Sequence, residues 1–317
     1  MGFNPENIQI GISACLLGEK VRFDGGHKAS KYCEKELKPH FDFVPICPEM
    51  AIGMGAPRKS IRLVRDNQHL YVRSADGSVD VTDKLNDFSQ QKVQQLGFLG
   101  GYILCAKSPT CGMERVIEYK IDTNNGTKVG VGVFARTLMD KFPSLPVEEE
   151  GRLHDLVIRE NFFTRVYAYH DWQCLLLSGV SKHKLITFHA RYKYLLMAHS
   201  PKLYRLLGPL LGDMSDDIQL VSETYFAKFM DILSIKATRK NHTSVLQHIQ
   251  GYFKTHLSQA QKEELSETIL KYHQGLQPIL VPITLINHYL REYPSDYIEK
   301  QVYLNPHPES LKLRYAF

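Results

Sequence analysis

The feature that most constrains this chain is a change of hydrophobic pattern at the segment 142–146, Phe-Pro-Ser-Leu-Pro. Before this segment, short apolar runs alternate with polar stretches of helical character. After it, almost every stretch repeats apolar residues at helical spacing. Strands separated by helices favour a mostly parallel sheet, whereas successive helical stretches favour helices packed on helices. The sequence therefore predicts a Rossmann-like α/β domain followed by an all-α domain.

The expected elements follow from these local patterns. Strands are predicted at 8–13, 41–46, 101–106 and 129–134, with a hairpin that pairs 69–73 with 79–82 around the Asp76-Gly77 turn. Helices are predicted at 29–37, 83–96, 148–169, 185–198, 201–211, 218–235, 243–256, 258–274 and 282–292. A chain of 317 residues is long enough for two hydrophobic cores. We expect an α/β domain at 1–145, a helical connector at 146–184 and a helical domain at 185–317.

Composition narrows the class of protein. Hydrophobic residues make up 43% of the chain and charged residues 23%, as in ordinary globular proteins. No apolar run approaches the roughly 20 residues of a membrane-spanning helix. The first residues lack the basic start and apolar stretch of a secretory signal. Six cysteines without an export signal favour a reducing compartment, so we expect a cytoplasmic protein with no membrane segment.

The positive charge is concentrated in the helical half. The net charge is only +5, but the windows 175–212 and 232–262 contain Lys and Arg without any Asp or Glu. Such windows are either solvated helix faces or a surface that binds phosphate groups. Candidate RNA-binding residues in these windows are Lys193, Arg239, Lys240 and Lys254. Lys193 and Lys254 have aromatic neighbours in the sequence, which would either stack on RNA bases or belong to the core.

Three cysteines each follow a predicted strand of the first half. Cys15 follows the strand 8–13, Cys47 follows 41–46, and Cys111 lies in the loop Ser-Pro-Thr-Cys-Gly after 101–106. In open α/β sheets, ligands gather at the carboxyl ends of the strands. Three thiolates placed there would hold zinc or an iron–sulfur cluster, unless they are unrelated buried thiols. Cys105 lies inside a strand and favours core packing, and Cys33 and Cys174 lie in helical stretches without a role in this site.

The same segments resemble a known family. The motifs at 13–18, 21–25, 47–49 and 108–112 resemble, in order and context, those of the thiouracil desulfidase family. The helical half is similar to the YbgA-like domain that is fused to this family, through 193–200, 241–254 and 278–284. Together these segments span nearly the whole chain. The fused arrangement resembles bacterial tRNA 4-thiouridine desulfidases.

This resemblance implies a cofactor and a reaction. It implies a [4Fe-4S] cluster on Cys15, Cys47 and Cys111, with one iron open to the sulfur of a thiocarbonyl. The implied substrate is tRNA that carries 4-thiouridine, which the enzyme would convert to uridine. Glu49, two residues after a ligand cysteine, is the candidate general acid/base, and Ser108 would orient the ring or water.

Three further residues are candidates for substrate binding. Arg22 and Asp24 lie in a turn before Gly25, where they would either hold substrate or brace each other, and Lys107 would steer a phosphate.

Two other functions stay open. One is desulfidation of free thiouracil or a thiolated nucleotide. The other is a nucleic-acid-binding or regulatory protein with a structural metal site. A carboxylate beside a ligand cysteine favours an enzyme, and the acid-free basic windows favour tRNA over a free base.

Overall fold

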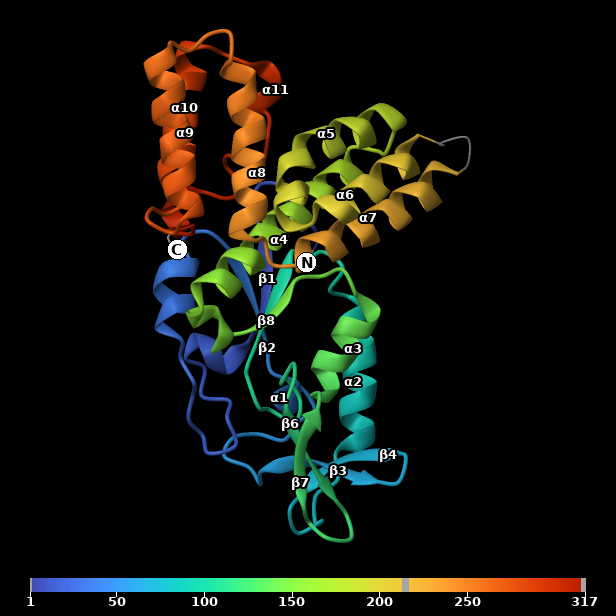
Figure 1. Ribbon diagram of the computed structural model, residues 1–317. Helices are drawn as coiled ribbons and strands as arrows, with labels where there is room; N and C mark the ends of the chain where they lie inside the picture. Colours follow the sequence, from blue (N-terminus) through green and yellow to red (C-terminus); the bar gives the residue numbers. More distant parts are fainter. Residues whose placement is uncertain (1, 213–216, 315–317) are drawn as a thin grey trace. The chain divides into compact units, whose positions relative to one another are not determined.

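The computed structural model describes residues 2–212 and 217–314, and the chain divides into two compact units, Met1–His154 and Asp155–Phe317. The first unit contains both β-sheets, and the helices of the second unit pack on one another (Figure 1). The expected fold class, an α/β domain followed by an all-α domain, is confirmed. Within the described residues, no helix is both long enough and apolar enough to cross a bilayer.

The first sheet is entirely parallel. Its order is β2 (Asp42–Ile46), β1 (Gln9–Ser13), β5 (Gly101–Leu104) and β8 (Val147–Glu149). Both central strands are almost completely buried, which explains their continuous apolar sequences. Gly11 is required in β1, because a Cβ there would lie 2.2 Å from the ring of Tyr102 in β5. All carboxyl ends of this sheet therefore meet at one edge.

The second sheet is mixed, and the sequence analysis anticipated only part of it. Its order is β4 (His69–Ser74), β3 (Ile61–Asp66), β6 (Val116–Lys120) and β7 (Gly126–Gly130). The β3–β4 and β6–β7 pairs are antiparallel, and β3–β6 is parallel. One face packs on α2 (Thr82–Gln94) and α3 (Val133–Lys141) through a small apolar cluster. The main partner of β4 is thus β3, and the predicted pairing with 79–82 is reduced to one bridge, Arg73 with Asp80.

The predicted strand at 129–134 is wrong beyond Gly130. Residues 126–130 form β7, and the chain turns at Gly132 into α3. The apolar residues that suggested a strand are instead the start of a helix whose first N–H groups bond to the loop that carries Cys111. The remaining short elements of this unit are α1 (Pro48–Ala51), a π-helix (Tyr32–Leu37) and 3-10 turns at Ala14–Leu17 and Arg152–His154.

The second unit is built from helices with clear starting signals. Its longer helices are α4 (Leu156–Leu177), α5 (Lys182–His199), α6 (Pro201–Leu207), α7 (Ile218–Ser234), α8 (Arg239–Gln250), α9 (Gln259–His273) and α10 (Leu280–Glu292). The shorter ones are α11 (Asp296–Glu299) and the 3-10 turns Gly208–Leu211, Gly251–Phe253 and Glu309–Leu311. Side chains of Ser181, Thr238 and Ser258 accept hydrogen bonds from the first turns of α5, α8 and α9, as N-caps do.

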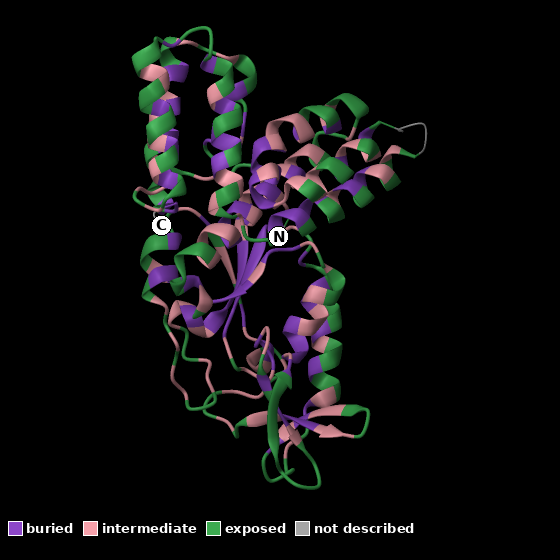
Figure 2. Ribbon diagram, in the orientation of Figure 1, coloured by how far each residue is buried: buried purple, intermediate pink, exposed green. Residues whose placement is uncertain are grey.

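Aromatic residues fill the core of this second unit. Trp172 stacks on Phe226, with ring centroids 4.6 Å apart and planes 5° apart. Phe188 lies against both Trp172 and Tyr192. Buried residues form stripes along the helices, with exposed residues on their other sides (Figure 2). The core is therefore closed by the helices' own amphipathic faces.

Candidate functional site

A cavity of about 490 Å³ lies at the carboxyl ends of the parallel strands. The residues after β1, β2 and β5 line it, and residues of the 21–28 and 58–61 segments complete its wall. Open α/β sheets bind their ligands at this edge because loops from several strands converge there. The volume is typical of sites for small organic ligands.

The cavity brings the three strand-end cysteines together. Cys15, Cys47 and Cys111 all line it. Cys105 also lines it and is only 6% exposed, so the thiol that the sequence assigned to the core lies at the edge of the site. Cys33 is buried outside the lining, and Cys174 lies on α4 of the second unit.

The protein environment disfavours bare thiolates at the three candidate ligands. Burial raises the pKa of Cys111 to about 12 and also raises the pKa of Cys47. A side-chain hydrogen bond to Cys105 raises the pKa of Cys15. Thiols in such surroundings become thiolates when a metal centre supplies compensating positive charge. The donor set is soft sulfur, which suits an iron–sulfur cluster.

The spacing of the cysteines bears on the kind of centre that they could hold. Within 2–212 and 217–314, no three His, Cys, Asp or Glu side chains are grouped closely enough to hold one metal ion. A cubane takes each thiolate on a different iron, so its ligands lie farther apart around a larger space. Three cysteines on the wall of one cavity are compatible with that arrangement.

The loop that carries Cys111 is fixed by the start of α3. The backbone N–H groups of Gly132 and Phe134 donate to the carbonyls of Gly112 and Thr110 at 2.8 and 3.0 Å. Gly132 is needed for this approach, because a Cβ there would lie 2.5 Å from the carbonyl of Thr110. Contacts with the start of α3 therefore hold the loop in the position that presents its side chains to the cavity.

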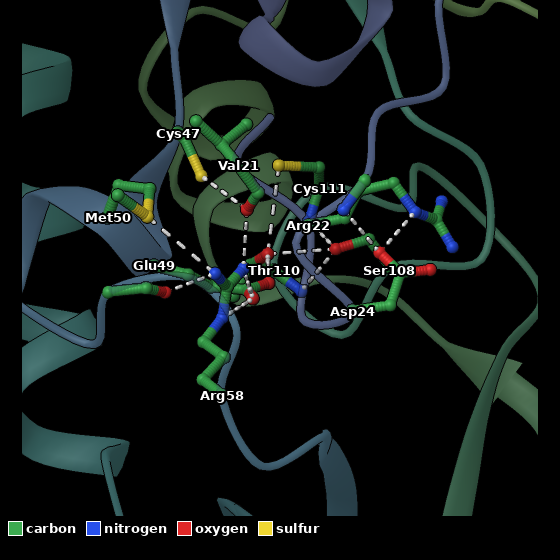
Figure 3. A network of polar contacts seen from close by, with 12 residues as sticks. Val21, Arg22, Asp24, Cys47, Glu49, Met50, Arg58, Ser108, Thr110 and Cys111 are labelled. Carbon is green, nitrogen blue, oxygen red and sulfur yellow. Dashed lines mark hydrogen bonds and ion pairs between the residues drawn. The ribbon is translucent and has the colours of Figure 1, made fainter. Parts of the chain in front are cut away.

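Glu49 is held on both of its oxygens (Figure 3). Its Oε2 accepts from Nε of Arg58 at 2.9 Å and forms an ion pair with the same guanidinium, while Oε1 accepts from the Thr110 hydroxyl at 2.7 Å. The side chains of Arg58 and Glu49 are only 5% and 12% exposed. Arg58 also donates to the carbonyls of Val21 and Gly55 at 2.9 and 2.6 Å. Arg58 thus fixes the Glu49 carboxylate through Oε2, and Oε1 faces the Thr110 hydroxyl.

Ser108 is the outer end of the same hydrogen-bond chain. Its hydroxyl lies 2.8 Å from Thr110 Oγ1 and accepts from the backbone N–H of Cys111 at 3.1 Å. Because Thr110 donates to Glu49, Ser108 donates to Thr110. Thr110 Oγ1 also lies 3.7 Å from the sulfur of Cys111. The chain Ser108–Thr110–Glu49 therefore runs beside a candidate ligand (Figure 3).

Sequence reasoning missed Thr110 and Arg58. Thr110 stands between Ser108 and Cys111 in the cysteine-bearing loop, so its position was a usable signal. Arg58 carries no local signal, since only the folded chain brings it to Glu49.

Only two of the three proposed substrate-binding residues line the cavity. Arg22 and Lys107 line the cavity, and Lys107 has a left-handed backbone with φ of 65°. Asp24 does not line it. The Gly26 backbone N–H donates to Asp24 at 3.0 Å and lowers the pKa of that carboxyl, with Arg22 nearby at 3.6 Å. Arg22 and Asp24 therefore brace the turn, and Arg22 alone of the two reaches the cavity wall.

The basic residues of the helical unit lie on its surface. Lys240 and Lys254 are exposed, and Arg239 is half-buried. The Lys193 ammonium lies 5.1 Å from the ring centroid of Tyr194 and 5.9 Å from that of Tyr297.

The aromatic neighbours of these lysines are mostly core residues. Tyr192, Tyr194 and Phe253 are buried. Tyr252 is 43% exposed and stacks on Tyr297 at 5.8 Å, so these two tyrosines are the rings available to a base.

Comparison with known proteins agrees with this division of the chain. Residues 10–150 match the family model described as 2-thiouracil desulfurase, and residues 193–308 match a protein family of unknown function, DUF1722. The Escherichia coli K12 protein YbgA, described as uncharacterized, is 33% identical over 154 residues, which cover 48% of this chain and 91% of YbgA. Among solved structures, the [4Fe-4S]-dependent thiouracil desulfidase TudS is 26% identical, with a TM-score of 0.39, over 48% of this chain and 97% of that chain. The expected fusion of a thiouracil desulfidase domain to a YbgA-like domain is confirmed.

Proposed function

Because the chain belongs to the YbgA family and carries a 2-thiouracil desulfurase domain ahead of its DUF1722 domain, we propose that it removes sulfur from 4-thiouridine in tRNA. The proposal rests on the set of residues that line the cavity. Three cysteines from three strand ends line it together with Glu49 and Ser108.

In this proposal Cys15, Cys47 and Cys111 hold a [4Fe-4S] cluster. Three protein ligands leave one iron of such a cluster with an open position, which has affinity for the soft sulfur of a thiocarbonyl. The overall reaction is hydrolytic: C=S and water give C=O and hydrogen sulfide, so no external oxidant or reductant is needed.

The chain's own residues would manage the protons of this reaction. Water that attacks the C–S carbon must lose both of its protons before C=O forms, and the sulfur must gain two to leave as hydrogen sulfide. Arg58 binds Oε2 of Glu49, so Oε1 is the atom that takes and returns a proton. When Oε1 is protonated, the Thr110 hydroxyl reverses and donates to Ser108 instead. The hydrogen-bond chain thereby carries a proton between Glu49 and the cavity.

The tRNA part of the proposal is supported by charge. A free thiouracil needs no phosphate-binding surface, yet the helical unit carries two acid-free basic windows. Arg22 and Lys107 add positive charge at the cavity wall, where a nucleotide's phosphates would lie.

The test is turnover of matched substrates by the cluster-loaded full chain under anaerobic conditions. We expect sulfide release and conversion of 4-thiouridine to uridine in tRNA, measured by mass spectrometry of the digested nucleosides. The cavity volume of about 490 Å³ also admits a nucleoside or free base, which is the second candidate substrate. Turnover of free 4-thiouracil without turnover of thiolated tRNA would establish that candidate instead. No sulfide from either substrate would refute a desulfidase.

A further inference from the structure

The second sheet has one covered face and one open face. On the covered face, Leu63, Val72 and Val116 pack against residues of α2 and α3. Side chains alternate along a strand, so Arg62 and Tyr119 point to the opposite face. Exposed residues run along β7, at the edge of this sheet (Figure 2).

The strand register places the residues of the open face in two adjacent rows. Val64 pairs with Tyr71 on one side and with Tyr119 on the other, so two tyrosines flank one valine. In the next row Arg62 pairs with Arg73. Val64 is only 3% exposed, which shows that the neighbouring side chains cover it.

Each arginine of the face lies on a tyrosine. The Arg62 guanidinium carbon lies 4.4 Å from the ring centroid of Tyr119, and that of Arg73 lies 4.1 Å from the centroid of Tyr71. The Nε atoms of both arginines are buried and have no hydrogen-bond acceptor among the described residues. Arg73 is partly neutralised by Asp80 at 3.3 Å, whereas Arg62 donates only to the carbonyl of Ala75 among the described polar contacts. Arg62 therefore carries a charge that no described carboxylate neutralises, stacked on an aromatic ring.

Toward β7 the face is apolar and basic, while Asp66 at the far end of β3 lies on the same face. Ile117 is 38% exposed, and its strand partner Lys128 is exposed as well. Flat rings, guanidinium planes and a lysine on an open sheet are the groups that stack on unpaired bases and neutralise phosphates.

The face is connected to the cavity through the start of β3. Ser60 and Ile61 line the cavity, and Arg62 is the next residue. The backbone N–H of Arg58 donates to the carbonyl of Phe23 at 2.8 Å. Phe23 lines the cavity and is 44% exposed, so an aromatic ring stands at its rim. Strand β3 therefore begins at the cavity wall and continues into the second sheet.

We infer that the open face of the second sheet, formed by Arg62, Tyr71, Arg73, Tyr119 and Lys128, binds single-stranded segments of an RNA substrate. This goes beyond the proposed function, which assigns the RNA contacts to the helical unit, and rests on that function only for the choice of RNA as partner. Tyr71 and Tyr119 stack on unpaired bases, and the cations contact the adjoining phosphates.

The experiment measures binding of unmodified tRNA and of a fluorescent single-stranded RNA to the full chain by anisotropy, without turnover. The variants are the double replacement Tyr71→Ala/Tyr119→Ala and the single replacement Lys128→Glu. The control is Lys84→Glu, which makes the same charge change on α2, the helix that packs on the covered face. Circular dichroism establishes that each variant is folded.

We expect the double variant to bind single-stranded RNA at least about fivefold more weakly, because each base–aromatic stack that is lost has at least that effect. Lys128→Glu should weaken binding and reduce its salt dependence, while Lys84→Glu stays within twofold of the unchanged protein. If the double variant misfolds, RNA binding by Lys128→Glu is the test of the surface, since the exposed Lys128 side chain tolerates replacement. RNA affinities equal to the control in the folded variants would overturn the inference. Because no turnover is needed, intact RNA binding without desulfidation would count against the proposed reaction and not against this surface.

Discussion

Replacing Arg58 tests whether the Glu49 carboxylate is held by a buried ion pair. Arg58→Met removes the positive charge at similar side-chain length. It leaves the Glu49 carboxylate, 12% exposed, without its guanidinium, and it removes the hydrogen bonds that Arg58 donates to the carbonyls of Val21 and Gly55. Breaking a buried pair from one side costs about 3–5 kcal/mol in the free energy of unfolding. The lost carbonyl bonds act in the same direction.

The neighbouring residue offers a matched control. Lys59 also forms an ion pair, with Asp76 at 2.8 Å, but its side chain is 57% exposed. Lys59→Ala should therefore leave the stability of the first unit nearly unchanged.

The assay must report on the first unit alone. The single tryptophan, Trp172, lies in the second unit, so its fluorescence serves as an internal reference during urea unfolding. Hydrogen–deuterium exchange of peptides from β1 and β5 follows the first unit. We expect Arg58→Met to lower the urea midpoint of the first unit and to leave the Trp172 transition in place. Equal stability of the first unit in Arg58→Met and Lys59→Ala would refute the role assigned to this pair.

Three further predictions concern the cofactor, the proton chain and the RNA. Serine at any one of the three cysteines proposed as ligands should abolish iron binding, whereas Cys33→Ser should leave the iron content unchanged; iron retained in the ligand variants would contradict the assignment. Glu49→Gln should keep the cluster and lose about 100-fold or more in turnover, and Thr110→Val should slow turnover without loss of iron; full activity of either loaded variant would remove that residue from the proton chain. Charge reversal at Lys193 or Lys254 should weaken turnover of thiolated tRNA and spare free thiouracil, and an equal loss on both substrates would point to a structural role.

The fold could be predicted wherever one hydrophobic pattern dominates. The buried strands β1 and β5 are continuous apolar runs, and the long helices of the second unit begin at recognisable caps. The second sheet was largely missed because its strands carry charges on the covered side. Arg65 in β3 pairs with Glu118 in β6 at 2.9 Å, and Glu118 is buried. Charged residues at buried positions break the alternation of apolar and polar residues by which a half-buried strand is predicted.

The candidate site could be predicted from order along the chain, because parallel strands end at one edge. That rule placed the three cysteines, Glu49 and Ser108 at one cavity. It could not predict Arg58, which reaches Glu49 only through the folded loop. It also could not show that Asp24 lies outside the cavity, because the partners of Asp24 lie within its own turn. Likewise, helical spacing alone could not separate the buried Tyr192 from the exposed Tyr252.

The proposed [4Fe-4S] cluster is tested most directly by an absorbance spectrum of the full chain, taken anaerobically after reconstitution with iron and sulfide. The iron and sulfide contents of the same sample are measured as well. We expect a brown protein with a broad visible band and about four irons and four sulfides per chain. Cys111→Ser, treated identically, should lose this band. A colourless protein that binds zinc and no iron, or a band that persists in Cys111→Ser, would contradict a [4Fe-4S] cluster held by Cys15, Cys47 and Cys111.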